Sequence, residues 1–325
     1  LRARVHSELT LIGRLRPSAV VSGTTLSQLV SARAARVPLV YVKPFAYSWP
    51  HVRQVRSVPL LSRDIPFGDM VDRGAAVLLR EVARWVTYKP GSFREVAREY
   101  GVELPRRTIE ALDADLNLVA SHSPWLRSYR LPAHYRLVGP VFARLPGEVP
   151  PEVVTIAEEA AGQGRPVVYV AMGSSGNRKT VLTVLRELSR MPVTVIAPVA
   201  HFLTEKDRQG LGAHVHVCGL LPAHLLGPFV DAAVIHGGEG TVQTAVLWGK
   251  PFVGIGFQLE QRWNVADCVD FGAAVALAPA DAGGEPLRRA LTRVLHEPSI
   301  RARAKEIADL FASVDGAAAA AEHID

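Results

Sequence analysis

DAAVIHGGEGTVQTAVLWGKPFVGIGFQLEQRWN, residues 231–264, is the stretch that decides the fold of this chain. Residues 231–235 form a short apolar run typical of a buried strand, and a helix-period segment begins at Thr241. Between them lie His236, Gly237, Gly238, Glu239 and Gly240. A helix start leaves unpaired backbone N–H groups and a positive charge of about half a unit, which together favour phosphate. The pattern therefore predicts a phosphate-binding turn between a strand and a helix.

A second cluster follows in the same stretch. After Pro251 comes another apolar run, residues 252–255, and then the pair Glu260 and Gln261, with Asn264 one helical turn later. Carboxylate and amide side chains supply acceptors and donors in the number that the hydroxyls of a sugar ring require. The pair could also be an ordinary polar helix start, but its position after the G-K-P step favours sugar binding.

The order of these residues resembles the donor-site signature of GT-B glycosyltransferases. H-G-G-x-G-T followed by [DE]-Q-x-x-N is similar to the pattern in the group of nucleotide-sugar-dependent macrolide, sterol and UDP-glucuronosyl transferases. The resemblance implies an α/β fold of two Rossmann-like domains, each with a doubly wound parallel sheet, that face a cleft. It implies that Glu260 and Gln261 bind the donor sugar, and that the diphosphate is bound by His236, Gly237, Gly238, Glu239, Gly240 and Thr241. His236 is interpreted as a phosphate contact rather than as the catalytic base.

Composition agrees with a two-domain protein that binds small molecules. A chain of 325 residues with 48% hydrophobic content is long enough for two cores. The net charge of +6 and the pI near 9.5 come from scattered basic residues, so nucleic acid is not an expected partner. Cys218 and Cys268 show no disulfide or zinc spacing, and no apolar run reaches a membrane span. We expect a cytoplasmic protein, leaving peripheral membrane contact and oligomeric state open.

The domain boundary is expected at a proline-rich connector. Residues 140–151 read PVFARLPGEVPP, which cannot form a helix or a central strand. We therefore assign residues 1–140 to an acceptor-side Rossmann-like domain, 141–151 to the linker, and 152–325 to the donor-binding domain. The resemblance implies that the last helix crosses back to the first domain. It also implies that the first domain either lacks its first strands here or is naturally short.

In the first domain, strands are predicted at 19–22, 39–43, 116–120 and 135–138, and helices at 25–36, 70–88 and 93–100. Residues 43–69 are predicted to be an irregular loop with aromatic residues Phe45, Tyr47 and Trp49 and basic residues His51, Arg53, Arg56 and Arg63. These aromatic side chains could face the acceptor, although packing on their own domain is the favoured interpretation.

Asp113 and Asp115 spell D-x-D, a pattern that chelates a metal in a different glycosyltransferase fold. No further carboxylate cluster accompanies them, and so short a match is common by chance. We interpret the pair as the exposed end of a helix, and we expect no metal site.

The second domain alternates strands and helices, which predicts a parallel sheet. Strands are expected at 167–172, 193–197 and 214–218, and helices at 179–189, 203–209 and 223–229, all before residue 231. The first turn carries Gly173, Ser174 and Ser175, which resemble a second diphosphate-contacting turn of the family. Residues 217–222 resemble the segment whose backbone pairs with the nucleotide base, so Leu220 is expected to bind through its main chain. Neither a Walker motif nor a G-x-G-x-x-G motif occurs.

These observations predict a hexosyltransferase that moves a sugar from a UDP- or TDP-sugar to a small, largely apolar acceptor. Inversion is implied by the resemblance, and no cofactor or metal is expected. The catalytic base is not identified, because Gly23 stands where relatives often have an acid. A non-catalytic protein that binds a nucleotide sugar is the alternative, and a nucleotide-sugar epimerase is disfavoured because its motifs differ. Arg53, Arg56 and Arg63 could instead face an anionic lipid surface, but a soluble acceptor is favoured.

Overall fold

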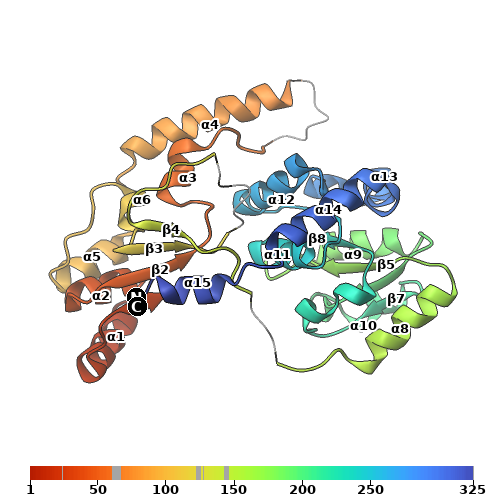
Figure 1. Ribbon diagram of the computed structural model, residues 1–325, viewed down its shortest axis with the longest axis horizontal. Coiled ribbons are helices and arrows are strands. Elements are labelled where there is room, and N and C mark those ends of the chain that lie inside the picture. The colour runs from red at the N-terminus through yellow and green to blue at the C-terminus, as the bar shows by residue number, and fades with distance from the viewer. Residues whose placement is uncertain (24, 61–66, 122–125, 127, 143–145, 325) are drawn as a thin grey trace. The chain divides into compact units, whose positions relative to one another are not determined.

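The computed structural model describes residues 1–23, 25–60, 67–121, 126, 128–142 and 146–324. They form two compact units. Unit 1 comprises Leu1–Val58, Met70–Val141 and Asp315–Asp325, and unit 2 comprises Pro59–Asp69 and Phe142–Val314. Each unit contains one sheet of parallel strands (Figure 1). The predicted α/β class with two parallel sheets is confirmed.

Unit 1 has a four-stranded sheet in the order β1-β2-β3-β4. Its strands are β1 (Val20–Ser22), β2 (Leu39–Lys43), β3 (Leu116–Val119) and β4 (Tyr135–Leu137). Its helices are α1 (Arg2–Leu15), α2 (Gln28–Ala35), α3 (Trp49–Gln54), α4 (Gly68–Trp85), α5 (Gly91–Glu99), α6 (Thr108–Ala111) and α15 (Gly316–Glu322). The predicted strand-helix-strand unit is present as β1, α2 and β2, with Val20 in register with Leu39. Ala320 of α15 joins the core formed by Val40, Leu118 and Val138.

The prediction of an irregular loop over residues 43–69 is wrong in part. Helix α3 lies within it, and the last two residues belong to α4. Ser48 caps α3 by accepting the backbone N–H of His51, and Pro50 occupies its first turn, where a missing N–H has no cost. The prolines that suggested a loop therefore include one that starts a helix. Arg63 lies outside the described residues.

His51 makes the stability of unit 1 dependent on pH. Its ring is 5% exposed, contacts Phe45, and accepts the Tyr47 N–H at Nδ1 over 3.3 Å, so the neutral form is required. Burial lowers the pKa of His51 from its ordinary 6.5 to about 4. The unfolded chain therefore binds the proton more readily, and stability is complete above pH 6.5 and declines as the pH falls toward 4, by about 3 kcal/mol in total.

Urea unfolding of the wild type and of His51→Gln at pH 7.0 and 4.5 tests this expectation, since the variant lacks the titrating ring. The wild type should lose more stability than the variant between the two pH values. Equal losses would show that protonation of His51 does not destabilise the fold.

The interpretation of the pair as exposed charges is wrong for Asp113, whereas Asp115 is exposed as expected. Asp113 forms an ion pair of 3.1 Å with the buried Lys43 and accepts the hydroxyl of Tyr135, and its side chain is 15% exposed. Asp115 accepts the backbone N–H of Leu39 over 2.8 Å. The two carboxylates thus serve different partners within the fold. Within the described ranges, no group of three His, Cys, Asp or Glu side chains is placed to hold a metal ion.

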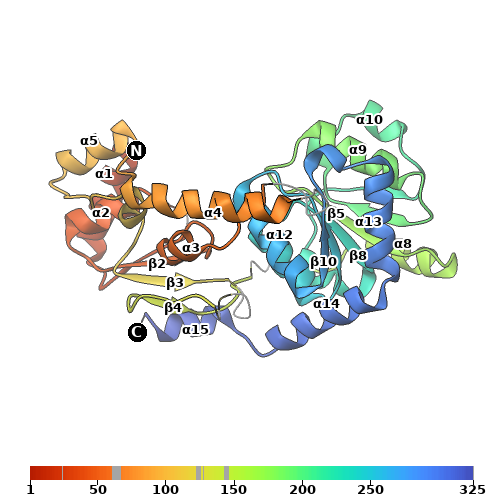
Figure 2. The ribbon, with the colours of Figure 1, turned by 90° about the horizontal axis from the view of Figure 1, so that it is seen from above.

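Unit 2 has a six-stranded sheet in the order β10-β9-β8-β5-β6-β7. Its strands are β5 (Val167–Ala171), β6 (Thr194–Ala197), β7 (Val215–Val217), β8 (Ala232–Ile235), β9 (Phe252–Gly254) and β10 (Ala274–Ala276). Its helices are α8 (Pro151–Gly162), α9 (Arg178–Leu188), α10 (Glu205–Gln209), α11 (Glu239–Leu247), α12 (Leu259–Phe271), α13 (Gly284–His296) and α14 (Pro298–Phe311). Counted from β5, this is the Rossmann order, whose direction reverses between β5 and β8. Figure 2 shows the helices on the two faces of this sheet.

Alternate residues of the strands face a core that is closed by two helices. Val168, Val170 and Met172 pack with residues of α9 and α13, such as Leu185 and Leu291. The predicted helix at 223–229 is wrong, because the segment forms two 3₁₀ turns, η2 (Ala223–Leu225) and η3 (Gly227–Phe229). Further 3₁₀ segments occur as η1 (Ala200–Phe202) and η4 (Pro279–Asp281). No helix in the described part of the chain is long and apolar enough to cross a membrane.

Candidate donor-binding site

The candidate site lies where strands β5 and β8 end side by side. The two strands are parallel neighbours, with Ala171 in register with Ile235. Each strand runs directly into a glycine turn, at Gly173 and at Gly237. Because open α/β sheets bind ligands beyond the carboxyl ends of their strands, at the point where strand order reverses, both turns face the expected ligand region. The structure thus brings together the two turns that the sequence predicts for the diphosphate.

His236 lies between the two turns. Its side chain is 6% exposed, and Nδ1 lies 3.3 Å from the carbonyl oxygen of Ala171, which also accepts the His236 backbone N–H. A carbonyl can only accept, so Nδ1 carries the proton and Nε2 of the neutral ring has a free lone pair. Burial lowers the pKa of His236. The ring is therefore neutral near pH 7 in the ligand-free protein.

The glycines at 173 and 238 leave room for this ring. A Cβ at Gly173 would lie 2.5 Å from His236 Nε2, and one at Gly238 would lie 2.4 Å from the same atom. Glycine is required at residue 237 for a different reason. Its φ is +80°, and a Cβ there would lie 2.7 Å from the carbonyl oxygen of Gln261. The glycines therefore set the position of His236 and the close approach of α12.

Helix α11 begins at the second turn. Its N-cap is Gly238, which has no side chain to pair with the first backbone N–H groups. The Thr241 hydroxyl donates to the Gly238 carbonyl over 2.8 Å, and Gly240 is exposed with open space around its Cα. A helix start of this kind favours an anion.

Helix α12 approaches the second turn with Glu260 and Asn264. Asn264 Nδ2 donates to the Gly237 carbonyl over 3.1 Å and to Glu260 Oε1 over 2.5 Å. Glu260 also accepts the backbone N–H of Glu239. Its pKa is raised, chiefly by burial, and the two hydrogen bonds oppose that rise. Asn264 was not among the predicted site residues, although its spacing of one turn from Glu260 was visible in the sequence.

The first turn is tied to α12 as well. Ser174 is exposed, whereas Ser175 accepts a 2.7 Å hydrogen bond from Gln261 Nε2. Gln261 itself is 2% exposed. Helix α12 therefore contacts both glycine turns, one through Gln261 and the other through Asn264.

Leu220 lies after β7 with its side chain 82% exposed. The segment before it is held to β6 and to η1, because the Cys218 N–H donates to the Ala197 carbonyl and the Cys218 carbonyl accepts the N–H of Ala200. Among the described residues, no protein group pairs with the Leu220 N–H or carbonyl. Its backbone N–H and carbonyl are thus available to a ligand.

The aromatic residues predicted for the acceptor side differ in exposure. Phe45 is 6% exposed and packs edge-on against Tyr129, so it belongs to the core of unit 1. Tyr47 is 50% exposed, and Trp49 is half-buried beneath the guanidinium of Arg53 at 4.7 Å. Of the three, Tyr47 and Trp49 offer surface to a ligand.

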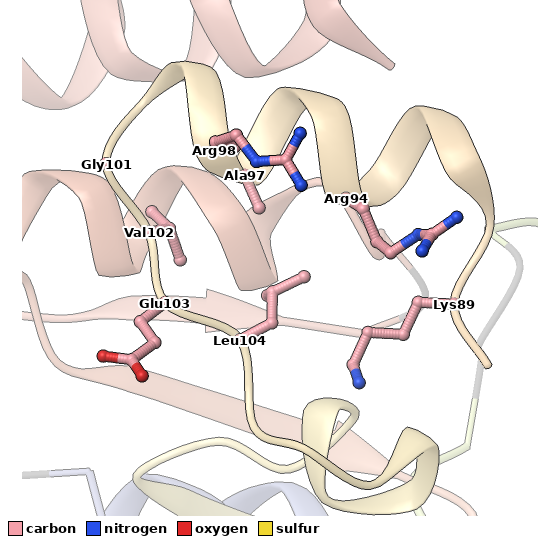
Figure 3. A pocket seen from close by; sticks show the side chains of 8 residues that line it. All are labelled: Lys89, Arg94, Ala97, Arg98, Gly101, Val102, Glu103 and Leu104. Carbon is pink, nitrogen blue, oxygen red and sulfur yellow. The ribbon is translucent and has the colours of Figure 1, made fainter. Parts of the chain in front are cut away.

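Unit 1 also has a surface pocket of about 380 Å³ beside α5 (Figure 3). Its lining residues are Lys89, Arg94, Ala97, Arg98, Gly101, Val102, Glu103 and Leu104. Lys89 Nζ donates to the carbonyl of Arg106 over 2.7 Å, which commits the most buried cation of the pocket to the backbone. None of the predicted site residues lines this pocket.

The chain is similar to proteins of known activity. Residues 183–322 match the family described as erythromycin biosynthesis protein CIII-like, C-terminal domain. A PGL/p-HBAD biosynthesis rhamnosyltransferase of Mycobacterium bovis (strain BCG / Pasteur 1173P2) is 28% identical over 96% of this chain and 67% of its own length. The 4'-demethylrebeccamycin synthase of Lentzea aerocolonigenes is 32% identical over 60% of this chain and 45% of its own length.

Solved structures show the same fold. The spinosyn forosaminyltransferase SpnP superposes with a TM-score of 0.67 at 20% identity, covering 98% of this chain and 78% of SpnP. The glycosyltransferase VinC in complex with DTDP gives 0.66 at 20% identity, covering 98% of this chain and 75% of VinC. The fold is therefore GT-B. The curated relatives, which are named as a rhamnosyltransferase and a glycosyltransferase, show that the chain is a glycosyltransferase.

Proposed function

We propose that this chain transfers a hexose from a thymidine diphosphate sugar to a hydroxyl or amine of a small, largely apolar acceptor. The observation that carries the proposal is the meeting of two glycine turns around His236 at the ends of β5 and β8. Two similar structures, VinC in complex with DTDP and SsfS6 complexed with thymidine diphosphate, favour thymine over uracil.

Each part of the donor has a proposed partner. The diphosphate binds the turn of Gly173, Ser174 and Ser175 and the helix start from Gly237 to Thr241. The base pairs with the exposed backbone of Leu220. The sugar hydroxyls bind Glu260, whose carboxylate faces the second turn through its bond to the Glu239 N–H.

The proposed reaction is an in-line displacement at the anomeric carbon. The acceptor oxygen or nitrogen forms the new bond, the bond from the anomeric carbon to the diphosphate oxygen breaks, and the configuration inverts. The acceptor proton passes to a base that is not among the residues assigned here. Charge on the departing diphosphate is stabilised by the start of α11, by Ser174 and Ser175, and by a protonated His236, so the proposal requires no metal.

The acceptor is proposed to be apolar. One relative is named as a rebeccamycin synthase and another, from Pichia angusta, as a sterol 3-beta-glucosyltransferase. Exposed Tyr47 and half-buried Trp49 in unit 1 offer aromatic surface for such a molecule. Arg53 stacks on Trp49 and is not clustered with enough cations to hold an anionic membrane, which favours a soluble acceptor.

A donor and acceptor screen read by mass spectrometry tests the proposal. Thymidine diphosphate hexoses with aromatic or polyketide-like alcohols should give products heavier by one hexosyl group, and His236→Ala should give little product. Co-sedimentation with anionic vesicles that weakens with salt would point to a lipid acceptor. Tight donor binding without transfer to any acceptor would contradict the proposal and favour a non-catalytic nucleotide-sugar-binding protein.

A further inference from the structure

Gln261 occupies an unusual place for a sugar ligand. It is the third residue of α12, and its side chain is buried to 2% exposure. Its neighbour Glu260 is only half-buried. The two residues that the sequence pairs as sugar ligands are therefore in different environments.

Nearly all hydrogen-bond donors and acceptors of the Gln261 side chain are paired within the protein. Its Oε1 accepts the backbone N–H groups of Phe257 and Gln258, over 3.0 and 3.2 Å. Its Nε2 donates to Ser175 Oγ over 2.7 Å. An amide oxygen has two lone pairs and an amide nitrogen two N–H groups, so both acceptor positions and one donor are occupied. A sugar hydroxyl could bind only by displacing bonds that close the start of α12.

The bond to Ser175 sets the direction of that hydroxyl. Because Ser175 Oγ accepts from Gln261, its own O–H remains available to donate. The Ser175 turn follows β5, where the proposed diphosphate lies. A hydroxyl that must donate suits a phosphate oxygen, which can only accept.

We infer that Gln261 is a positioning residue, which orients Ser175 as a donor to the diphosphate and leaves contact with the sugar to Glu260. The inference rests on the proposed donor site. It assigns Gln261 to the nucleotide diphosphate end of the donor, whereas its sequence position next to Glu260 predicted the sugar end.

Gln261→Glu separates these roles. Glutamate at the third position of a helix makes the same capping bonds as glutamine, so α12 should start as before. The new carboxylate, however, has no N–H to donate to Ser175 and would instead accept a hydrogen bond from the Ser175 hydroxyl. The Ser175 hydroxyl would then no longer donate to the diphosphate, and the new negative charge would lie beside the diphosphate.

The experiment measures binding of two probes, dTDP and a dTDP-hexose, by calorimetry. Gln261→Glu should weaken both by the same factor, about ten- to a hundredfold, as expected for a lost hydrogen bond to a charged group. Ser175→Ala should weaken both in the same direction, and it covers the case in which Gln261→Glu fails to fold. Glu260→Gln is the comparison variant: it should weaken the dTDP-hexose by a larger factor than dTDP.

A Gln261→Glu protein that binds dTDP like the wild type but loses affinity for the dTDP-hexose would overturn the inference, because this is the signature of a sugar ligand. Equal dTDP affinity in wild type and Ser175→Ala would overturn it as well. A wild-type protein that binds no nucleoside diphosphate would refute the proposed function itself, and the inference with it.

Discussion

Replacing His236 by alanine is expected to lower kcat/KM for the sugar donor by about 10²–10³, the usual cost of removing one preorganised donor to developing negative charge. The ring is held between Gly173 and Gly238 at the ends of two strands, so it is positioned before the donor arrives. The fold should persist, because the carbonyl of Ala171 keeps its bond to the backbone N–H of residue 236.

His296→Ala is the matched control, since His296 is exposed on α13 within the same unit. It should leave activity unchanged. Steady-state rates and circular dichroism of both variants make the comparison. If His236→Ala kept wild-type activity while folding normally, His236 would have no role at the diphosphate.

The same ring gives donor binding a pH dependence. Nδ1–H is directed at Ala171, so Nε2 can donate to a phosphate only when the ring takes up a proton. Burial lowers the pKa of His236 in the free protein, and an adjacent diphosphate raises it. Affinity should therefore increase as the pH falls through the bound-state pKa and level off below the free-state pKa.

The probe for this dependence is the dTDP-hexose, because the terminal phosphate of dTDP itself titrates near about pH 6. The increase in dTDP-hexose affinity with falling pH should vanish in His236→Ala. It should persist in Glu260→Gln, which removes the other titratable side chain bonded to this turn. If the pH dependence of affinity were lost in Glu260→Gln and kept in His236→Ala, His236 would not be its source.

Asp113→Ala should destabilise unit 1 by about 3 kcal/mol, toward the lower end of the cost of leaving a buried charge without its counter-ion. Lys43 is 6% exposed, and Asp113 is its ion-pair partner. Asn117 and Tyr135 still contact the Lys43 ammonium at 3.0 and 3.3 Å, which reduces the loss of stability.

Urea unfolding measures this change, and the double variant Lys43→Met/Asp113→Ala is the control, because it removes both charges. The double variant should recover much of the stability. The deficit of Asp113→Ala should also shrink at alkaline pH, since burial lowers the pKa of Lys43 and the neutral amine is less costly to bury. A deficit that is equal in both variants would show that the ion pair is not its cause.

The sequence predicted the local structure around His236 well, because its signal was local. His236 and the glycines around it stand between an apolar run and a helix start, so the strand, the turn and the helix start could be inferred from neighbours in the chain. The bond between Ser175 and Gln261 could not be inferred, because it joins residues 86 apart and depends on the close approach of α12 at Gly237.

Local sequence signals also gave wrong predictions where one residue type is compatible with two structures. Prolines in residues 43–69 indicated a loop, yet Pro50 lies in the first turn of α3, where it is compatible with a helix. Asp113 was expected to be exposed because charges usually are, and only the fold brings the buried Lys43 to it from a strand distant in the sequence. Helix α13 was not predicted, although its buried residues close the core of unit 2.

The path of the chain has a consequence for its synthesis on the ribosome. Helix α15 packs its Ala320 into the core of unit 1, and a Cβ at Gly316 would lie only 2.2 Å from the Pro140 carbonyl. Residues 142–314 must be translated between Val138 and α15, which takes roughly ten to thirty-five seconds at 5–20 residues per second. Throughout that interval the apolar face of the first sheet that α15 covers in the folded chain is uncovered. Nascent chains stalled before residue 315 should therefore engage chaperones through unit 1.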